Sequence, residues 1–141
     1  MDTTIHASAV LLGAKAVLIR GPSGSGKSRL AWQLLNSALP FTRLVGDDRV
    51  HLEVRNGRLL ARPAKELTGL IEVRGLGIRR LVYEPLATVG LVVDLAAPDA
   101  GRLPEGGETI VDGVKLPRLA VETGADALSM VLAFLGTHPS G

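Results

Sequence analysis

Cysteine is missing from the sequence, and so is any long apolar run. Without cysteine the chain can form neither a disulfide nor a thiolate-ligated metal site, which suits a reducing cytoplasm. No apolar run approaches the roughly 20 residues that a membrane-spanning helix needs. The first residues, Met1-Asp2-Thr3-Thr4, lack the basic start and apolar centre of a signal peptide. We therefore expect a cytoplasmic protein that has no membrane partner.

The sequence also has few aromatic residues and only a small excess of positive charge. Aromatic residues make up 3% of the 141 residues, so the core has to be built from Val, Leu, Ile and Ala. The formal net charge is +2, and arginines such as Arg79 and Arg80 are scattered rather than gathered in a long basic run. A nucleic-acid partner is therefore not expected. The length fits one domain over residues 1–141, and no linker or internal repeat divides the chain.

Hydrophobic periodicity predicts an α/β fold with a mixed sheet and several hairpins. Two segments have helical spacing, 27–36 and 125–135. Apolar segments predict strands at 7–12, 16–20, 43–45, 50–54, 58–61, 89–95, 109–111 and 116–121. The first two strands are expected to form a hairpin, and Asn56-Gly57 is a strong turn signal for another. Residues 67–78 fit either a helix or a loop, and residues 96–107 are predicted to form an exposed, mobile loop.

Residues 21–28 fit the phosphate-loop pattern G-x-x-x-x-G-K-[ST], with a predicted strand before them and a predicted helix after them. The eight residues are Gly21, Pro22, Ser23, Gly24, Ser25, Gly26, Lys27 and Ser28. The glycines let backbone N–H groups curl around phosphate oxygens, and the helix directs its positive dipole end at the same anion. Lys27 is expected to contact the β- and γ-phosphates, and the Ser28 hydroxyl to bind Mg²⁺. The motif therefore predicts a site for ATP and Mg²⁺.

A second, acidic element is needed to hold Mg²⁺ and, in a kinase, to accept a proton from the acceptor hydroxyl. Asp47 and Asp48 follow an apolar strand. Adjacent residues at a strand end point to opposite sides, so one carboxylate can face the metal while the other faces the acceptor. An ordinary polar turn is the alternative interpretation. Glu72, His6 and Arg102 are weaker candidates when each is taken alone.

Several motifs, in this order, resemble the HPr kinase/phosphorylases. His6 lies fifteen residues before Gly21, the phosphate loop has the form G-x-S-G-x-G-K-S, and D-D-R-V follows at 47–50. The family signature E-[IV]-R-G-L-G-I is matched at 72–78, a stretch far more specific than the phosphate loop. The resemblance runs from His6 to the closing helix and implies the P-loop kinase domain of this family. Many members carry an additional N-terminal domain, and this chain looks like the shortened form without it.

The resemblance implies an ATP-dependent protein-serine kinase. Its acceptor would be a serine of HPr, the small phosphocarrier protein of the sugar phosphotransferase system, and inorganic phosphate would remove that phosphoryl group again as pyrophosphate. Family members form hexamers, which implies a homo-oligomer here. Carried over by position, the implied catalytic residues are Asp48 as the proton acceptor, Asp47 beside the metal, His6 against this acidic pair, Lys27 at the transferring phosphate and Arg102 in the mobile loop. Ser28 and Glu72 are the implied Mg²⁺ ligands.

Residues 120–126 depart from the family pattern. Where many members have P-V-R-P-G-R-N, this chain has A-V-E-T-G-A-D, so both arginines are missing and two acids, Glu122 and Asp126, are present. The family segment is linked to dephosphorylation, so we expect a better kinase than phosphorylase, unless an arginine elsewhere, such as Arg118, substitutes. A small-molecule kinase or NTPase with the same loop, and a nucleotide-binding module without catalysis, are the alternative functions.

Overall fold

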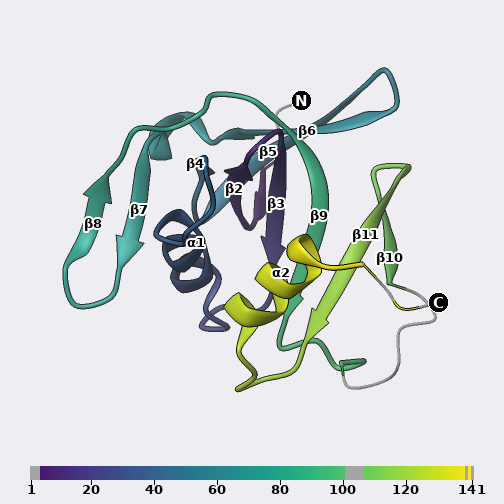
Figure 1. Cartoon of the computed structure of the whole chain (residues 1–141). Coiled ribbons are helices and arrows are strands. Elements are labelled where there is room, and N and C mark those ends of the chain that lie inside the picture. The colour runs from purple at the N-terminus through teal and green to yellow at the C-terminus, as the bar shows by residue number, and fades with distance from the viewer. Residues whose placement is uncertain (1–3, 101–106, 139, 141) are drawn as a thin grey trace.

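In the computed structural model, residues 4–100, 107–138 and 140 are described. They form one sheet of nine strands, one of two strands, two α-helices and a short 3₁₀ segment (Figure 1). In chain order the elements are β1 (Thr4–His6), β2 (Ser8–Leu12), β3 (Lys15–Arg20), α1 (Lys27–Leu35), β4 (Thr42–Gly46), β5 (Arg49–Arg55), β6 (Arg58–Pro63), η1 (Lys65–Leu67), β7 (Leu70–Val73), β8 (Gly77–Arg80), β9 (Ala87–Leu95), β10 (Glu108–Val111), β11 (Val114–Val121) and α2 (Ala127–Gly136). The predicted mixed α/β architecture is confirmed.

The larger sheet has parallel strands at its centre and antiparallel strands on its flanks. β9 pairs in parallel with both β3 and β11. β2 is antiparallel to β3 and to β4, while β6 pairs with the start of β9 and connects β5 and β1 to the sheet. The carboxyl ends of β3, β9 and β11 therefore lie at the same edge of the sheet, and the phosphate-loop residues follow β3 there.

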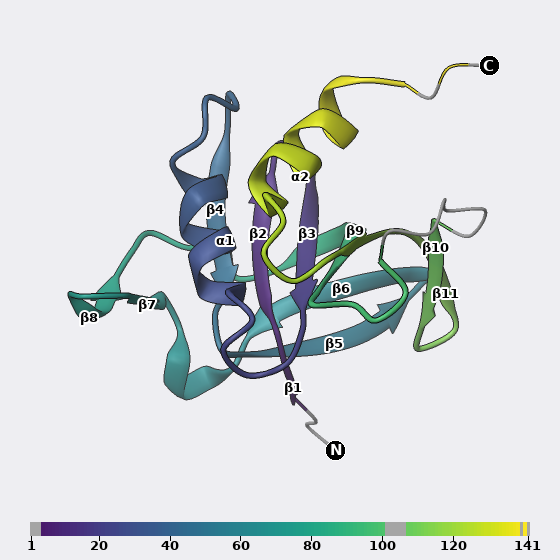
Figure 2. The same cartoon turned by 90° about the horizontal axis from the view of Figure 1, so that it is seen from below.

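Both helices pack on one face of this sheet (Figure 2). α1 buries Leu30 and Leu34 against that face. Along β3, Val17 belongs to the helix-covered core, whereas its neighbour Leu18 belongs to the core on the opposite face. A strand buried on both faces needs apolar residues in succession, which explains the continuous apolar run in this part of the sequence. β3 is thus a firmly packed base for the loop that follows it.

Residues 67–78, expected to be a helix or a loop, instead contribute to the β7–β8 hairpin. The Leu76 N–H donates to Val73 O to close the turn, and Gly75 and Gly77 both have a φ of +89°. Glycine adopts this left-handed region without steric cost, so the two glycines favour a tight turn over a helix. The two strands have four residues each, which is too short for their alternation to be recognised in the sequence.

The other predicted strands and helices are present, with boundaries that differ by a few residues. α2 begins at Ala127 rather than at 125, because the Asp126 carboxylate accepts the Ser129 N–H and caps the helix. β1 was not predicted, and it is held in place by pairing with β5. Neither helix in the described part of the chain has the length and apolar character that crossing a lipid bilayer requires.

Candidate active site

The phosphate-loop residues connect β3 to α1, and the start of α1 is uncapped. The helix begins at Lys27 with no side-chain cap and no acidic residue in its first turn. Gly24 and Gly26 have φ angles of +80° and +100°, and a Cβ added at either would meet no atom within 4 Å. No side chain therefore caps the N–H groups at the positive end of the helix dipole, an arrangement that suits phosphate.

Gly21 and Lys27 shape the loop from its two ends. A Cβ at Gly21 would lie 2.5 Å from Ser25 Oγ and 3.0 Å from Leu95 O, so only glycine fits between the loop and β9. The Lys27 ammonium donates to Gly21 O at 2.8 Å and to Pro22 O at 3.0 Å, which folds this side chain back across the loop. These hydrogen bonds hold the positive charge against the backbone that phosphate oxygens contact in loops of this pattern.

Asp47 and Asp48 lie in the tight turn between β4 and β5. The Arg49 N–H donates to Asp47 O at 2.8 Å and Asp48 has a φ of +68°, which together define a γ-turn. The turn separates the two side chains: Asp47 is 3% exposed, whereas the Asp48 side chain is 66% exposed. The structure thus contains the expected division of the pair into an inward and an outward carboxylate.

The inward carboxylate of Asp47 joins three elements of the fold. Its Oδ1 accepts from Ser8 Oγ at 2.5 Å, Ser28 Oγ lies 2.8 Å from both of its oxygens, and its Oδ2 accepts the Glu72 N–H at 3.1 Å. One anion thereby ties β2, α1 and β7 together through charge-assisted hydrogen bonds. Ser8 is fully buried on β2, and no motif in the sequence pointed to its part in the site.

The Ser28 hydroxyl and the Asp47 carboxylate are the groups with which this site could hold Mg²⁺. Both are hard oxygen ligands, and Mg²⁺ in nucleotide sites takes one or two carboxylates, with phosphates and waters completing its shell. Within the described residues, no group of three or more His, Cys, Asp or Glu side chains could hold a metal ion. The donor set therefore fits Mg²⁺ that arrives with a nucleotide. The Glu72 side chain is exposed, and its place as a third ligand stays a prediction.

His6 lies beside the outward carboxylate. Its Nδ1 is 3.9 Å from Asp48 Oδ1, which is beyond hydrogen-bond distance. On its other side, Arg49 Nη2 is 2.8 Å from His6 Nε2, and Arg49 also donates to Thr4 Oγ1 at 3.2 Å. Since a guanidinium can only donate, Nε2 is the accepting ring nitrogen in this arrangement. The structure brings His6 close to Asp48 and adds Arg49, for which the D-D-R-V motif had indicated no role. Arg102 lies outside the described residues.

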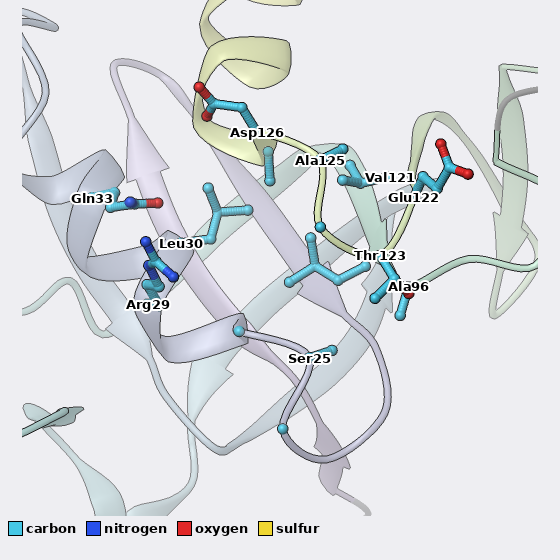
Figure 3. A pocket seen from close by; sticks show the side chains of 15 residues that line it. Ser25, Arg29, Leu30, Gln33, Ala96, Val121, Glu122, Thr123, Ala125 and Asp126 are labelled. Carbon is cyan, nitrogen blue, oxygen red and sulfur yellow. The ribbon is translucent and has the colours of Figure 1, made fainter.

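A cavity of about 550 Å³ lies beside the phosphate loop, between α1 and the segment that leads into α2 (Figure 3). Residues 24–26 of the loop and Leu30 of α1 line one side of it, and residues 121–127 line the other. The segment that departs from the family pattern is therefore part of this cavity. Its volume is within the range of pockets that hold small-molecule ligands.

Asp126 in that segment stabilises α2. Its carboxylate accepts the Ser129 N–H at 3.1 Å and the Ser129 hydroxyl at 2.7 Å. These two hydrogen bonds lower the pKa of Asp126, and the positive charge of Arg29 lowers it further. One of the two acids in place of the family pattern therefore serves as a helix cap, while Glu122 is exposed.

An ionic network joins β3, β9 and β11. Asp94 accepts from Arg20 at 2.7 and 2.9 Å and from Arg118 at 2.5 Å, and Arg118 also donates to Asp99 at 2.7 and 3.0 Å. Burial raises the pKa of Asp94, but the hydrogen bonds and charges of the two arginines outweigh burial and lower it. Hydrogen bonds to Asp99 and Asp94 raise the pKa of Arg118. Arg118 is therefore engaged within the fold, which argues against its replacing the missing arginines.

Comparison with known proteins points to one family. The family model described as HPr Serine kinase C-terminal domain matches residues 1–82. HPr kinase/phosphorylase from Clostridium beijerinckii is 40% identical over 77 residues, which are 55% of this chain and 24% of that protein. HPr kinase/phosphorylase from Streptococcus pyogenes serotype M5 is 32% identical over 151 residues, which are 96% of this chain and 48% of that protein. The chain spans about half the length, or less, of these curated relatives.

The fold has a counterpart among solved structures. The structure of the Hpr(Ser) kinase/phosphatase from Coxiella burnetii matches with a TM-score of 0.76 and 23% sequence identity. The match covers 95% of this chain and 93% of that one. This likeness confirms the predicted fold class, an α/β domain of the HPr kinase catalytic type.

Proposed function

Because the chain belongs to the HPr serine kinase C-terminal domain family, we propose that it is the catalytic domain of an ATP-dependent protein-serine kinase whose acceptor is an HPr-like phosphocarrier protein. The observation that carries this proposal is the turn at Asp47 and Asp48. One carboxylate of the turn binds Ser28 of the phosphate loop, and the other is exposed beside His6. A carboxylate suited to a metal ligand and one suited to a proton acceptor, in the same turn, support phosphoryl transfer to a hydroxyl. The names of the curated relatives support HPr as the acceptor.

In this proposal residues 21–28 bind the phosphates of ATP. The backbone N–H groups at the start of α1 contact the phosphate oxygens, and the Lys27 ammonium exchanges the carbonyl oxygens of Gly21 and Pro22 for those of the β- and γ-phosphates. Ser28 and Asp47 hold Mg²⁺, with Glu72 as the further ligand that the resemblance implies. When bound, Mg²⁺ neutralises charge on the phosphates. The cavity beside residues 24–26 has room for the ribose and base.

Asp48 acts as the general base. Its carboxylate accepts the proton of the acceptor serine, whose oxygen forms a bond to the γ-phosphorus while the bond to the β–γ bridging oxygen breaks and its electron pair leaves with ADP. Exposure of 66% lets an acceptor protein reach this side chain, and the γ-turn sets its direction away from the core. His6 lies within 3.9 Å to stabilise the charge of this carboxylate. Arg102 would assist at the γ-phosphate, which rests on the resemblance alone.

The test is to mix the protein with Mg-ATP and purified HPr and to measure phosphoserine by intact mass. The wild type should modify HPr on one serine, and Asp48→Asn should lower kcat by about 10²- to 10⁴-fold while nucleotide affinity is retained. ATP turnover that is independent of HPr, without phosphoserine, would instead support the small-molecule kinase or NTPase. Family membership does not favour that alternative.

Two further parts of the proposal also rest on the resemblance. The protein would form a homo-oligomer, a hexamer if it follows the family, and would act in the cytoplasm. Light scattering on the purified protein measures the first, and fractionation of producing cells measures the second.

A further inference from the structure

The β7–β8 hairpin presents a face that the core does not use. Directly opposed residues of an antiparallel pair point to the same side, and alternate residues share a side. The register pairs Glu72 with Ile78 and Leu70 with Arg80, so these four residues form one side, the hairpin face. Ile71, on the other side, is 1% exposed and packs in the helix-covered core. The hairpin face is therefore directed away from that core.

Exposed apolar residues are concentrated on this hairpin. In the described part of the chain, four large hydrophobic side chains are more than 60% exposed: Leu76 at 67%, Ile78 at 62%, Val82 at 73% and Ile110 at 70%. Three of the four fall on the hairpin or just after it, which is unlike the scattered single exposures that are normal on soluble proteins. The concentration indicates a surface that another molecule covers.

The hairpin is also positively charged. Arg74, Arg79 and Arg80 are exposed, and none of them has an ion pair with another described residue. Glu72 is the one acidic residue of the segment 70–82. A partner with complementary chemistry would carry carboxylates beside an apolar spot.

The position of the hairpin links this face to the catalytic turn. The Glu72 N–H donates to Asp47 Oδ2 at 3.1 Å, so the hairpin is anchored to the carboxylate that binds Ser28. From that anchor β7 and β8 extend to one side of the molecule, next to α1 (Figure 1). Ile78, opposite Glu72, is thus the part of the hairpin face nearest to the anchor. A protein bound there would lie next to the turn that contains Asp47 and Asp48.

We propose that the hairpin face is the docking surface for the acceptor protein, which binds Ile78 and Arg80 through an apolar side chain and a carboxylate close to its serine. The docking rests on the proposed function, because it needs an acceptor protein. This docking would explain why the hairpin exposes Leu76, Ile78 and three arginines that form no ion pair with another described residue. It also predicts that the KM for HPr rises with ionic strength, since salt screens exposed charge pairs.

The experiment compares Ile78→Ser and Arg80→Glu with two controls at exposed positions elsewhere. Ile110→Ser lies on β10, and Arg58→Glu lies at the start of β6. Each hairpin variant is expected to raise the KM for HPr by about tenfold or more, with nucleotide affinity and unfolding midpoint unchanged, whereas each control stays within about twofold of wild type. If Ile78→Ser lowers the unfolding midpoint, the Arg80→Glu result decides.

The outcomes separate the docking from the proposed function. If wild type produces phosphoserine and both hairpin variants keep the wild-type KM for HPr, the docking proposal is overturned and the function stands. A change of oligomeric state with an unchanged KM would likewise overturn the docking and assign the face to contact between copies. If wild type produces no phosphoserine at any HPr concentration, the proposed function fails and the docking fails with it.

Discussion

Asparagine substitution at each member of the acidic pair should separate the structural carboxylate from the exposed one. Asp47→Asn removes the charge from a group that accepts from Ser8, Ser28 and the Glu72 N–H. Hydrogen bonds to a charged acceptor contribute about 1.5–3 kcal/mol each, against about 0.5–1.5 kcal/mol for neutral pairs. The loss over these bonds is partly offset because a neutral amide costs less to bury. We expect the free energy of unfolding to fall by about 2 kcal/mol.

The geometry of the site explains why asparagine cannot replace this carboxylate. The Glu72 N–H can only donate, so the amide oxygen of the new side chain has to face it. The amide NH₂ then faces the hydroxyls of Ser8 and Ser28, which have to rotate and accept. The Ser28 hydroxyl would lose the acceptor that orients it, so Asp47→Asn should weaken Mg-ATP binding as well as stability.

Urea unfolding, followed by the fluorescence of the single tryptophan, Trp32 on α1, measures the stability difference. If the free energy of unfolding falls by about 2 kcal/mol for each molar of urea, a loss of about 2 kcal/mol in that free energy moves the urea midpoint by about 1 M. Asp48→Asn is the matched control, because its side chain is 66% exposed and asparagine tolerates the left-handed φ of this position. It should stay within about 0.5 kcal/mol of wild type. Equal midpoints for all three proteins, or equal losses in both variants, would show that Asp47 is not the structural member of the pair.

Further substitutions concern Lys27, Asp94 and Glu122. Lys27→Ala should abolish transfer to HPr and keep the unfolding midpoint, because among the described residues its ammonium bonds to carbonyl oxygens of the loop alone. Near-normal transfer would contradict its role. Asp94→Asn should destabilise the protein. Because the folded pKa of Asp94 lies below the unfolded value of 3.8, the difference in stability from wild type should be constant above about pH 6 and shrink as pH falls below about 4. Urea midpoints between pH 3 and 7 test this, and a difference that grows in acid would contradict the lowered pKa. Pyrophosphate release from phosphoserine-HPr at saturating phosphate should be slower than the forward reaction, and Glu122→Arg should raise it, since arginine grips phosphate oxygens that a carboxylate repels; a wild-type reverse rate at or above the forward rate would show that the missing arginines do not matter.

Local patterns in the sequence were sufficient to predict the phosphate loop and the divergence of the acidic pair. The glycines at 21, 24 and 26, between an apolar strand and a helix, predicted the loop because few other residues adopt such backbone angles beside a phosphate. The adjacency of Asp47 and Asp48 after an apolar strand predicted one inward and one outward carboxylate. Both residues lie beyond the end of β4, and the γ-turn separates their side chains. Both features depend on residues that are close in the chain.

The tertiary structure alone decided which distant groups complete the site. Ser8 and Glu72 are 39 and 25 residues from Asp47 in the chain, and no repeating pattern in the sequence indicates contacts at these separations. The β7–β8 hairpin was missed because its short strands depend on Ile71 packing in the core for their stability. The sequence allowed Arg118 to bind a phosphate in place of the missing arginines. The parallel pairing of β9 and β11 instead places its side chain against Asp94. Sequence determines local backbone preference and side-chain chemistry, whereas the partner of each charge is set by which strands the packed core brings together.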